Sequence, residues 1–395
     1  NKFIKVSWDT AYKKIVEKIN NTNSDNIAGF IGDLSNMETS YIAKEFFSKT
    51  IKSKNLESRD DYYIVDTRSR ENYIFNSGLN GIDKTDLIVL VGTNPRLEAT
   101  ILNSRIRNAF LKNKCKIYSF GDVGDLTYNY EIIDSNTCKF KEILSGNSQI
   151  SKEIENSSRP MFILGQSFFK LKSSTYLINE LKKYLLSINK IKENWSPINF
   201  LSKHASTVGS YDLNIISENF NNNDVLDRTL NNEFEIIFLI GQDNLKFKKK
   251  NEFIIYIGSH GDRGAEIADV ILPGSSYTEQ DGHYTNLEGV LQKSYKATYP
   301  PGDAKEDWEI INNLSQLLKR KKIHKNKDEL VSEMIHFINN NKNKKTETNT
   351  GDFFDEKIFT DYTDYYYSNV ISRSSKTMSE CRNIRNNIKK TGTEG

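Results

Sequence analysis

The sequence contains 395 residues, 37% of them apolar, and its 55 basic and 52 acidic side chains leave a formal net charge of +3. A chain of this length is sufficient for two domains or for one large doubly wound sheet whose halves are interleaved. Because the charges nearly cancel and no basic block alternates with aromatic residues, nucleic acid is not expected as a partner. The longest apolar runs have the length of strands, so a direct membrane span is not expected either.

The three cysteines, Cys115, Cys138 and Cys381, lie far apart and form no CxxC motif. An iron–sulfur cluster or structural zinc held by this chain's thiolates is therefore not expected. Asparagine, lysine, isoleucine and tyrosine are abundant in predicted helices and strands alike. This bias indicates A/T-rich coding, as in an organelle genome or an A/T-rich bacterium, rather than a structural requirement.

Residues 1–150 are predicted to form a first α/β part. A helix is expected after a Ser7 cap, and a second helix is expected from Ser35, which would form a capping box with Glu38. Strand, helix, strand at this spacing predicts right-handed parallel units. The predicted strands of this part lie near residues 27–31, 62–65, 86–91 and 116–120.

Residues 151–325 are predicted to form a second α/β part of the same kind. Most strands in both parts end at a glycine, as expected where parallel strands turn into loops at one edge of a sheet. The asparagine-rich stretch 217–232 is predicted to be a surface loop or a partner contact. The strands of this part are predicted near residues 161–164, 235–240, 253–257 and 268–272.

Residues 326–350 are predicted as a helix and a polar linker, and residues 351–395 as an extended aromatic tail. The tail carries Phe353, Phe354, Phe359 and three consecutive tyrosines from residue 365. Such aromatic groups rarely stay in water, so we expect the tail to lie on a partner or along the main body. The predicted fold is α/β, with interleaved doubly wound parallel sheets and an extended C-terminal tail.

Two loops at predicted strand ends carry groups that could bind a ligand. Gly92-Thr93-Asn94-Pro95 could present backbone N–H groups to a phosphate, but a simple turn and helix cap is the favoured interpretation. In the loop 275–289, the side chains Glu279, Asp281, His283 and Glu288 could bind a metal or act as an acid and base. His283 has no second histidine at helical spacing, so satisfying the loop's own backbone is favoured.

The remaining candidates do not form a catalytic group in the sequence. Ser259, His260 and Asp262 are too close along the chain for triad geometry, and no G-x-S-x-G elbow surrounds them. Cys115 and Cys138 fit ordinary small core or edge positions. The other histidines have no candidate partner nearby in the sequence; they are His204, His324 and His336.

Residues 268–289, which read ADVILPGSSYTEQDGHYTNLEG, resemble the ADV-LPG-YTE-G-Y-N-EG signature of the molybdopterin oxidoreductase superfamily. Residues 92–95 resemble the strand-end GTNP loop of that superfamily. Within it, the chain resembles the molybdopterin-oxidoreductase-like part of the large iron–sulfur subunit of respiratory NADH:ubiquinone oxidoreductase, complex I. Four stretches in the order of that family carry this narrower resemblance: 7–11, 92–107, 300–308 and 371–381.

This resemblance implies a non-catalytic structural subunit in the peripheral arm of complex I, on the matrix side of the mitochondrial inner membrane. The chain would support electron transfer from NADH to ubiquinone as a component of a proton-translocating enzyme, without catalytic, cofactor-binding or metal-binding residues of its own. Iron–sulfur clusters and FMN would lie on neighbouring subunits. The expected partners are the cluster-binding N-terminal half of a split subunit and the flavin- and NADH-binding subunits.

The resemblance also leaves an enzyme as the alternative. Relatives that use the cofactor commonly ligate its metal through Cys, selenocysteine or Ser, and no matching ligand is found here. The family often has Arg after Glu-Gly, where this chain has Val290, which removes a phosphate contact. An active oxidoreductase of the formate dehydrogenase type would carry molybdenum or tungsten in a funnel lined by residues 92–96 and 275–289. A free-standing nucleotide-binding module is a third reading, and it predicts saturable binding by the chain.

Overall fold

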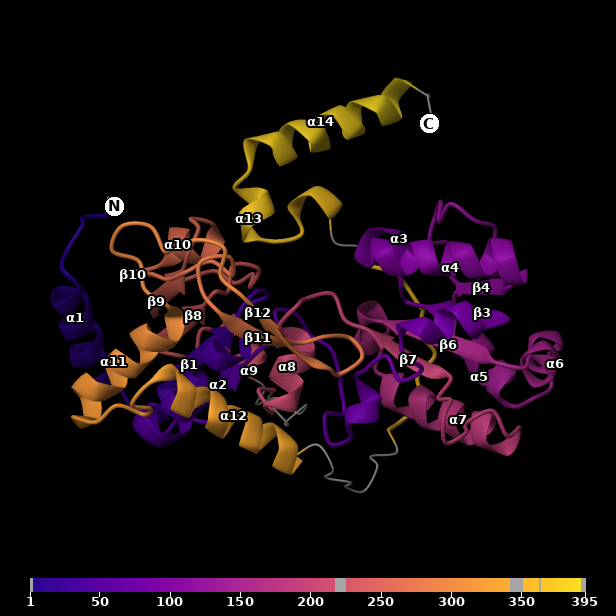
Figure 1. Cartoon of the computed structure of the whole chain (residues 1–395), viewed down its shortest axis with the longest axis horizontal. Helices are drawn as coiled ribbons and strands as arrows, with labels where there is room; N and C mark the ends of the chain where they lie inside the picture. Colours follow the sequence, from indigo (N-terminus) through magenta and orange to yellow (C-terminus); the bar gives the residue numbers. More distant parts are fainter. Residues whose placement is uncertain (1–2, 217–224, 342–350, 362–363, 392–395) are drawn as a thin grey trace.

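The computed structural model describes residues 3–216, 225–341, 351–361 and 364–391 (Figure 1). The strands are β1 (Ile27–Ile31), β2 (Leu56–Glu57), β3 (Leu87–Val91), β4 (Lys116–Phe120), β5 (Glu131–Asp134), β6 (Pro160–Gly165), β7 (Ile198–Leu201), β8 (Ile236–Ile240), β9 (Phe253–Gly258), β10 (Val270–Pro273), β11 (Gly282–Thr285) and β12 (Leu291–Ser294). The α-helices are α1 (Trp8–Asn20), α2 (Met37–Glu45), α3 (Pro95–Glu98), α4 (Thr100–Asn113), α5 (Thr137–Leu144), α6 (Gln149–Asn156), α7 (Ser174–Ser187), α8 (Thr207–Asp212), α9 (Val225–Leu230), α10 (Arg263–Ile267), α11 (Asp307–Lys319), α12 (Lys327–Asn341), α13 (Val370–Arg373) and α14 (Lys376–Thr391).

Two parallel sheets of five strands lie side by side (Figure 1). Their strand orders are β10-β9-β8-β1-β2 and β5-β4-β3-β6-β7, and β11 and β12 form a separate antiparallel hairpin. The chain builds β1 and β2, leaves to form the whole second sheet, and then returns to complete the first. The predicted α/β fold with interleaved doubly wound sheets is confirmed. The division into 1–150 and 151–325 does not follow the sheets, because each sheet takes strands from both ranges.

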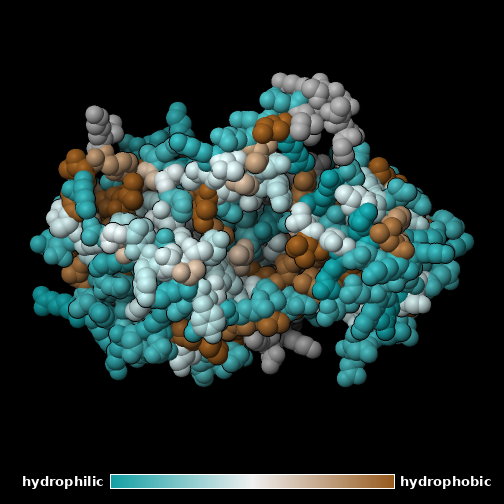
Figure 2. Space-filling model, turned by 45° about the horizontal axis from the view of Figure 1, so that its top comes forward, coloured by the Kyte–Doolittle hydropathy of each residue, from teal (hydrophilic) through white to brown (hydrophobic). Residues whose placement is uncertain are grey.

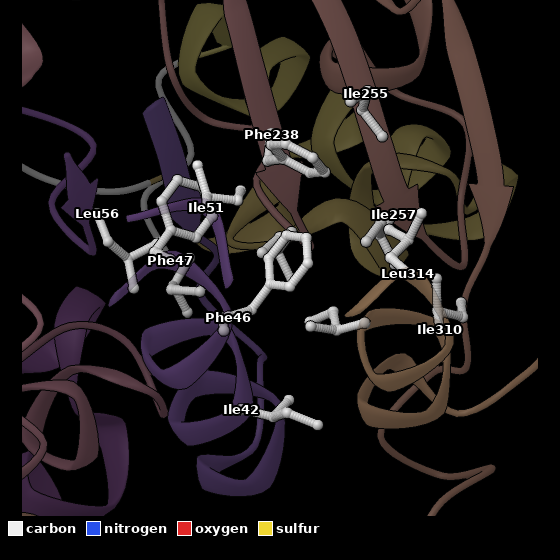
Figure 3. Close-up of a cluster of buried hydrophobic side chains, with 14 of the residues drawn as sticks. Ile42, Phe46, Phe47, Ile51, Leu56, Phe238, Ile255, Ile257, Ile310 and Leu314 are labelled. Carbon is white, nitrogen blue, oxygen red and sulfur yellow. The ribbon is translucent and has the colours of Figure 1, made fainter. Parts of the chain in front are cut away.

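Short, continuous apolar runs form the central strands. All residues of β1, β3, β6 and β8 are buried, as expected for parallel strands that are covered by other elements on both faces. One face of the first sheet packs against α1, α2, α11 and α12, and Figure 3 shows part of this cluster. There Phe46 and Phe47, at the end of α2, make edge-to-face contacts with Phe238 of β8. Such pairs add to the stability gained by burying the rings.

The predicted strand at 62–65 is absent. Tyr63 and Val65 are buried, but they lie in the segment that crosses from the first sheet to the second. The N–H of Ile64 donates to the carbonyl of Phe169, in the loop that follows β6, rather than to a neighbouring strand. The apolar pattern of residues 62–65 therefore predicted the burial of this segment correctly, but its prediction of a strand was wrong. The other predicted strands are present, with ends that differ by no more than a few residues.

Two further predictions need correction. In the stretch 217–232, residues 217–224 lie outside the described residues, but 225–230 form α9, whose Val225 and Leu226 pack into the core of the first sheet. At the second helix, the side chain of Asn36 accepts a hydrogen bond from the N–H of Thr39 and acts as the cap, in place of Ser35. The cap at Ser7 is confirmed, since its side chain accepts from the N–H of Thr10.

The C-terminal tail is extended only at its start. Residues 351–361 run along the second sheet's domain, where Ile358 is buried and the ring of Phe353 lies 5.5 Å from that of Tyr176. The rest of the described tail turns helical and ends in α14, because apolar groups recur at helical spacing from Met378 to Ile384. In the linker region, α12 is confirmed, while residues 342–350 lie outside the described part of the chain.

On the face shown in Figure 2, apolar side chains appear in separate small groups among polar ones. None of the described helices combines the length and the hydropathy that crossing a bilayer requires.

Candidate functional site

The loop after β3 is closed by the chain's own groups. Asn94 caps α3 by accepting a hydrogen bond from the N–H of Leu97, and Pro95 begins the helix. The carboxylate of Glu98 accepts hydrogen bonds from the N–H of Asn94 and from the hydroxyl of Thr93, at 3.2 and 2.8 Å. Burial raises the pKa of Glu98. The predicted turn and cap are confirmed, and a carboxylate takes the donors that a phosphate would need.

The loop 275–289 also uses its acidic groups for structure. Glu279 accepts from the N–H of Ser276 and Asp281 from the N–H of Lys296, so each satisfies nearby backbone as predicted. Glu288 instead reaches across the molecule to the N–H of Leu79. These acidic side chains therefore contact different parts of the molecule and do not converge on one site.

His283 has a partner that the sequence did not reveal. Its ring atom Nδ1 lies 2.6 Å from one carboxylate oxygen of Glu38 on α2. The backbone N–H of His283 donates to the other carboxylate oxygen at 2.8 Å. Glu38 is 1% exposed. The pair joins β11 to α2 and is not part of a metal-ligand cluster among the described residues. Val290, the residue that departs from the family signature, is half-exposed in the turn between β11 and β12.

The groups after β9 do not form a catalytic relay. The hydroxyl of Ser259 lies 2.9 Å from Nδ1 of His260, its immediate neighbour. Asp262 points elsewhere and forms a 2.5 Å ion pair with Arg373 of α13. Without a carboxylate to orient the imidazole, this arrangement lacks the third member of a triad.

A cavity of about 630 Å³ lies between the two sheets. Its walls come from residues that follow the carboxyl ends of β6, β7, β8 and β9, the edge at which doubly wound folds bind ligands. The rest of the wall comes from the segment after β2, from α9 and from the tail, and Figure 1 shows α13 above the junction of the sheets. Neither 92–96 nor 275–289 contributes to the lining, contrary to the funnel expected for the enzyme alternative.

Charged groups of both signs line this cavity. Lys170 pairs with Asp61 at 2.5 Å and with Asp361 of the tail at 2.7 Å. Lys203 donates to the backbone carbonyl of Asp361 at 2.7 Å. The tail therefore neutralises Lys170 through the Asp361 carboxylate and hydrogen-bonds Lys203 through a backbone carbonyl.

His204 lies beside two carboxylates at the edge of the cavity. Its Nδ1 is 3.4 Å from Asp33, and its Nε2 is 4.0 Å from Asp60. Asp33 also accepts a hydrogen bond from Asn244, and burial raises the pKa of Asp33. The ligand atoms of Asp33, Asp60 and His204 are close enough together to hold a cation. Sequence reasoning missed this group because its members follow three different strands.

The cavity does not suit the pterin dinucleotide of cofactor-using relatives. Its wall mixes carboxylates with lysines and arginines, so it presents no uniformly positive surface to a diphosphate; the carboxylates are those of Asp60, Asp61, Asp361 and Asp364. Glu98 occupies the donors of the GTNP loop, as described above. Among the described residues that line the cavity, none is a cysteine, and Ser368 is the serine present.

The remaining candidates lie away from the cavity. Cys115 is buried under the second sheet, and Cys138 and Cys381 are exposed. His336 lies on the surface of α12, where its Nε2 is 2.9 Å from the amide of Asn340. His324 is buried beneath the same helix.

Comparison with known proteins gives two family matches. The family model described as "Molybdopterin oxidoreductase" matches residues 1–317, and the model for the C-terminal part of the NADH-ubiquinone oxidoreductase subunit designated G matches residues 336–381. Among solved structures, the formyltransferase/hydrolase complex (FhcABCD) from Methylorubrum extorquens aligns with a TM-score of 0.59 at 10% identity. That alignment covers 81% of this chain and 98% of the other, and it concerns the fold alone.

Curated relatives match along almost the whole chain. It is 34% identical to the NADH-ubiquinone oxidoreductase 75 kDa subunit of Reclinomonas americana, over 96% of this chain and 58% of the relative. It is 33% identical to the corresponding NADH-quinone oxidoreductase subunit of Rickettsia bellii, over 99% of this chain and 57% of the relative. The NADH-ubiquinone oxidoreductase 78 kDa subunit of Candida albicans, a mitochondrial protein, is 32% identical, with coverages of 96% and 55%.

The chain thus spans a little over half the length of these relatives and corresponds to their C-terminal part. The narrower resemblance to the large iron–sulfur subunit is confirmed. The interleaved sheets of the chain and the family match over residues 1–317 show that the chain belongs to the molybdopterin oxidoreductase family.

Proposed function

We propose that this chain is a non-catalytic structural subunit in the peripheral arm of respiratory complex I, on the matrix side of the mitochondrial inner membrane. The observation that carries the proposal is the match of 96% of the chain to a relative named as a subunit of NADH-ubiquinone oxidoreductase. The second match, over residues 336–381, extends the same assignment into α12 and the tail.

The role of a scaffold agrees with how the cavity is built. Asp361 of the tail pairs with Lys170 in its wall, which occupies one of the cations that an anionic cofactor would use. The glycine-containing loop after β3 is occupied by Glu98. Electron transfer slows steeply with distance, so a rigid subunit supports it by fixing the spacing of redox groups on its neighbours. The iron–sulfur clusters and FMN would be held by those neighbours, and this chain would hold none of them.

Helix α14 is the part of the chain that is best placed to contact a partner. It stands apart from both sheets in Figure 1, and its main neighbours are α13 and Tyr365–Tyr367. No side chain of its described residues 376–387 is buried, and Ile384 is 59% exposed. A helix with an exposed apolar group and no covering layer gains stability when a partner covers it. The expected partners are a protein region that binds iron–sulfur clusters and the flavin- and NADH-binding subunits.

Native electrophoresis of detergent-solubilised mitochondrial membranes tests the assignment. Mass spectrometry of each band should find the chain in the band that oxidises NADH. Finding it only in bands that lack this activity would contradict the proposal. The enzyme alternative is tested on the same material, because it requires stoichiometric molybdenum or tungsten on a chain that migrates alone.

A further inference from the structure

One buried histidine has no hydrogen-bond partner. His324 is 1% exposed, and no described residue bonds to either of its ring nitrogens. Its nearest aromatic neighbour is Tyr41, whose ring centre is 6.1 Å away. Buried polar atoms in native proteins are nearly always hydrogen-bonded, and an unsatisfied one commonly marks an ion or water. The imidazole of His324 therefore indicates a ligand.

Two carboxylates converge on this imidazole from different helices. Glu333 of α12 lies 3.8 Å from Nδ1 of His324, and Glu45 is the last residue of α2. The ligand atoms of Glu45, His324 and Glu333 all lie within 4.8 Å of one another. The three residues belong to separate elements, so one ion would join α2, α12 and the loop after α11.

We propose that Glu45, His324 and Glu333 form a binding site for a divalent transition-metal ion, with Zn²⁺ as its expected occupant. One imidazole nitrogen and two carboxylate oxygens are ligands that zinc accepts, and water would complete a tetrahedral shell. Burial lowers the pKa of His324, which favours the neutral ring that a metal requires. The carboxylates supply charge that offsets that of the cation.

The surroundings allow an ion to enter. Glu333 has a half-exposed side chain and lines a cavity of about 470 Å³ together with Tyr41 and His336. Lys49 contacts the carboxylate of Glu45, but its own side chain is 63% exposed and can move into solvent. The site therefore opens to the surface through Glu333, while His324 stays buried beneath it.

Calorimetric titration of the metal-free, full-length chain with Zn²⁺ tests this site. Wild type should bind one ion at this site, and Glu333→Gln and His324→Gln should each weaken that binding event at least about tenfold, whether or not a second ion binds at Asp33, Asp60 and His204. The matched control is His260→Gln, which changes a histidine in the loop after β9, outside the acidic clusters of the described residues, and should bind zinc as wild type does. Because the Glu333 side chain is half-exposed, the Glu333→Gln variant should fold as wild type does.

Thermal unfolding gives an independent readout. Zinc should raise the Tm of wild type and of His260→Gln, because an ion that binds only the folded state stabilises it. The rise should be smaller for Glu333→Gln. The proposal is overturned if wild type binds no zinc. It is equally overturned if the two cluster variants bind zinc as tightly as wild type, which would place any bound zinc elsewhere.

Discussion

A Cβ atom on Gly32 would lie 1.6 Å from the carbonyl oxygen of Gly241. These glycines follow β1 and β8, which are neighbours at the centre of the first sheet. The second sheet repeats the arrangement, since a Cβ on Gly165 would lie 2.3 Å from the carbonyl oxygen of Gly92. In both sheets, the close approach of two strand ends depends on the absence of a side chain.

Replacing either inner glycine should therefore destabilise the fold. Gly32→Ala and Gly165→Ala force backbone atoms apart, so each should lower the free energy of unfolding by about 1–3 kcal/mol or more. Urea unfolding measures the change. Gly261→Ala is the control, because no atom lies within 4 Å of its added Cβ, and it should change stability by less than about 0.5 kcal/mol. Equal stability of all three variants would refute the packing argument.

The Glu38–His283 pair should be a major link between the hairpin and α2. His283→Ala leaves the buried carboxylate of Glu38 without the imidazole that lies 2.6 Å from it, so we expect a loss of about 1–3 kcal/mol in unfolding free energy. His336→Ala, which changes an exposed histidine, should lower the unfolding free energy far less. Urea unfolding measures both variants. If both cost the same small amount, the pair would not be a structural link.

Asp307 should make the folded state sensitive to pH. Burial raises its pKa to about 7, from about 3.8 in the unfolded chain. Between these values the folded state holds one more proton than the unfolded state, so this carboxyl lowers stability as pH rises. Asp307→Asn removes that titration. Relative to wild type, the variant should gain roughly 2–4 kcal/mol between about pH 4 and about pH 8. A constant difference across this range would contradict the buried, protonated state.

Truncation should separate the two roles of the tail. A chain ending at Ser374 lacks α14 but keeps Ile358 and the Arg373–Asp262 pair, so its stability should change by less than about 0.5 kcal/mol. Its incorporation into the NADH-oxidising complex should fall, as seen by native electrophoresis. A chain ending at Gly351 also loses the buried Ile358 and should be destabilised by at least about 2 kcal/mol. Normal incorporation of the chain that ends at Ser374 would show that α14 contacts no partner.

The sequence was informative wherever burial alone decides the structure. Strands β3 and β8 are continuous apolar runs, and their positions were predicted nearly to the residue. β7 was missed because it contains the buried polar residue Asn199, whose carboxamide oxygen accepts hydrogen bonds from Ser77. β2 has only two residues, and one is the charged Glu57. In β7 and β2, hydrogen bonds and ion pairs of polar side chains, rather than hydrophobicity, determine where the strand forms.

The histidine partners could not be found from the sequence for a related reason. His204 meets Asp33 and Asp60, and His324 meets Glu45, only because distant elements share one sheet edge or one helix contact. One signal was available, since Asp33 and His204 each follow a strand end. With β7 predicted, the convergence of parallel strand ends would have suggested that these two lie near each other.

We propose that the cavity between the sheets performs no chemistry. The most direct test is the NADH:ubiquinone turnover per assembled complex in cells that carry Lys246→Ala and Arg263→Ala together. Both residues line the cavity and are exposed, so assembly should be normal. We predict turnover equal to that of wild type. A loss of tenfold or more in complexes that assemble normally would contradict the account and make the cavity part of the catalytic machinery.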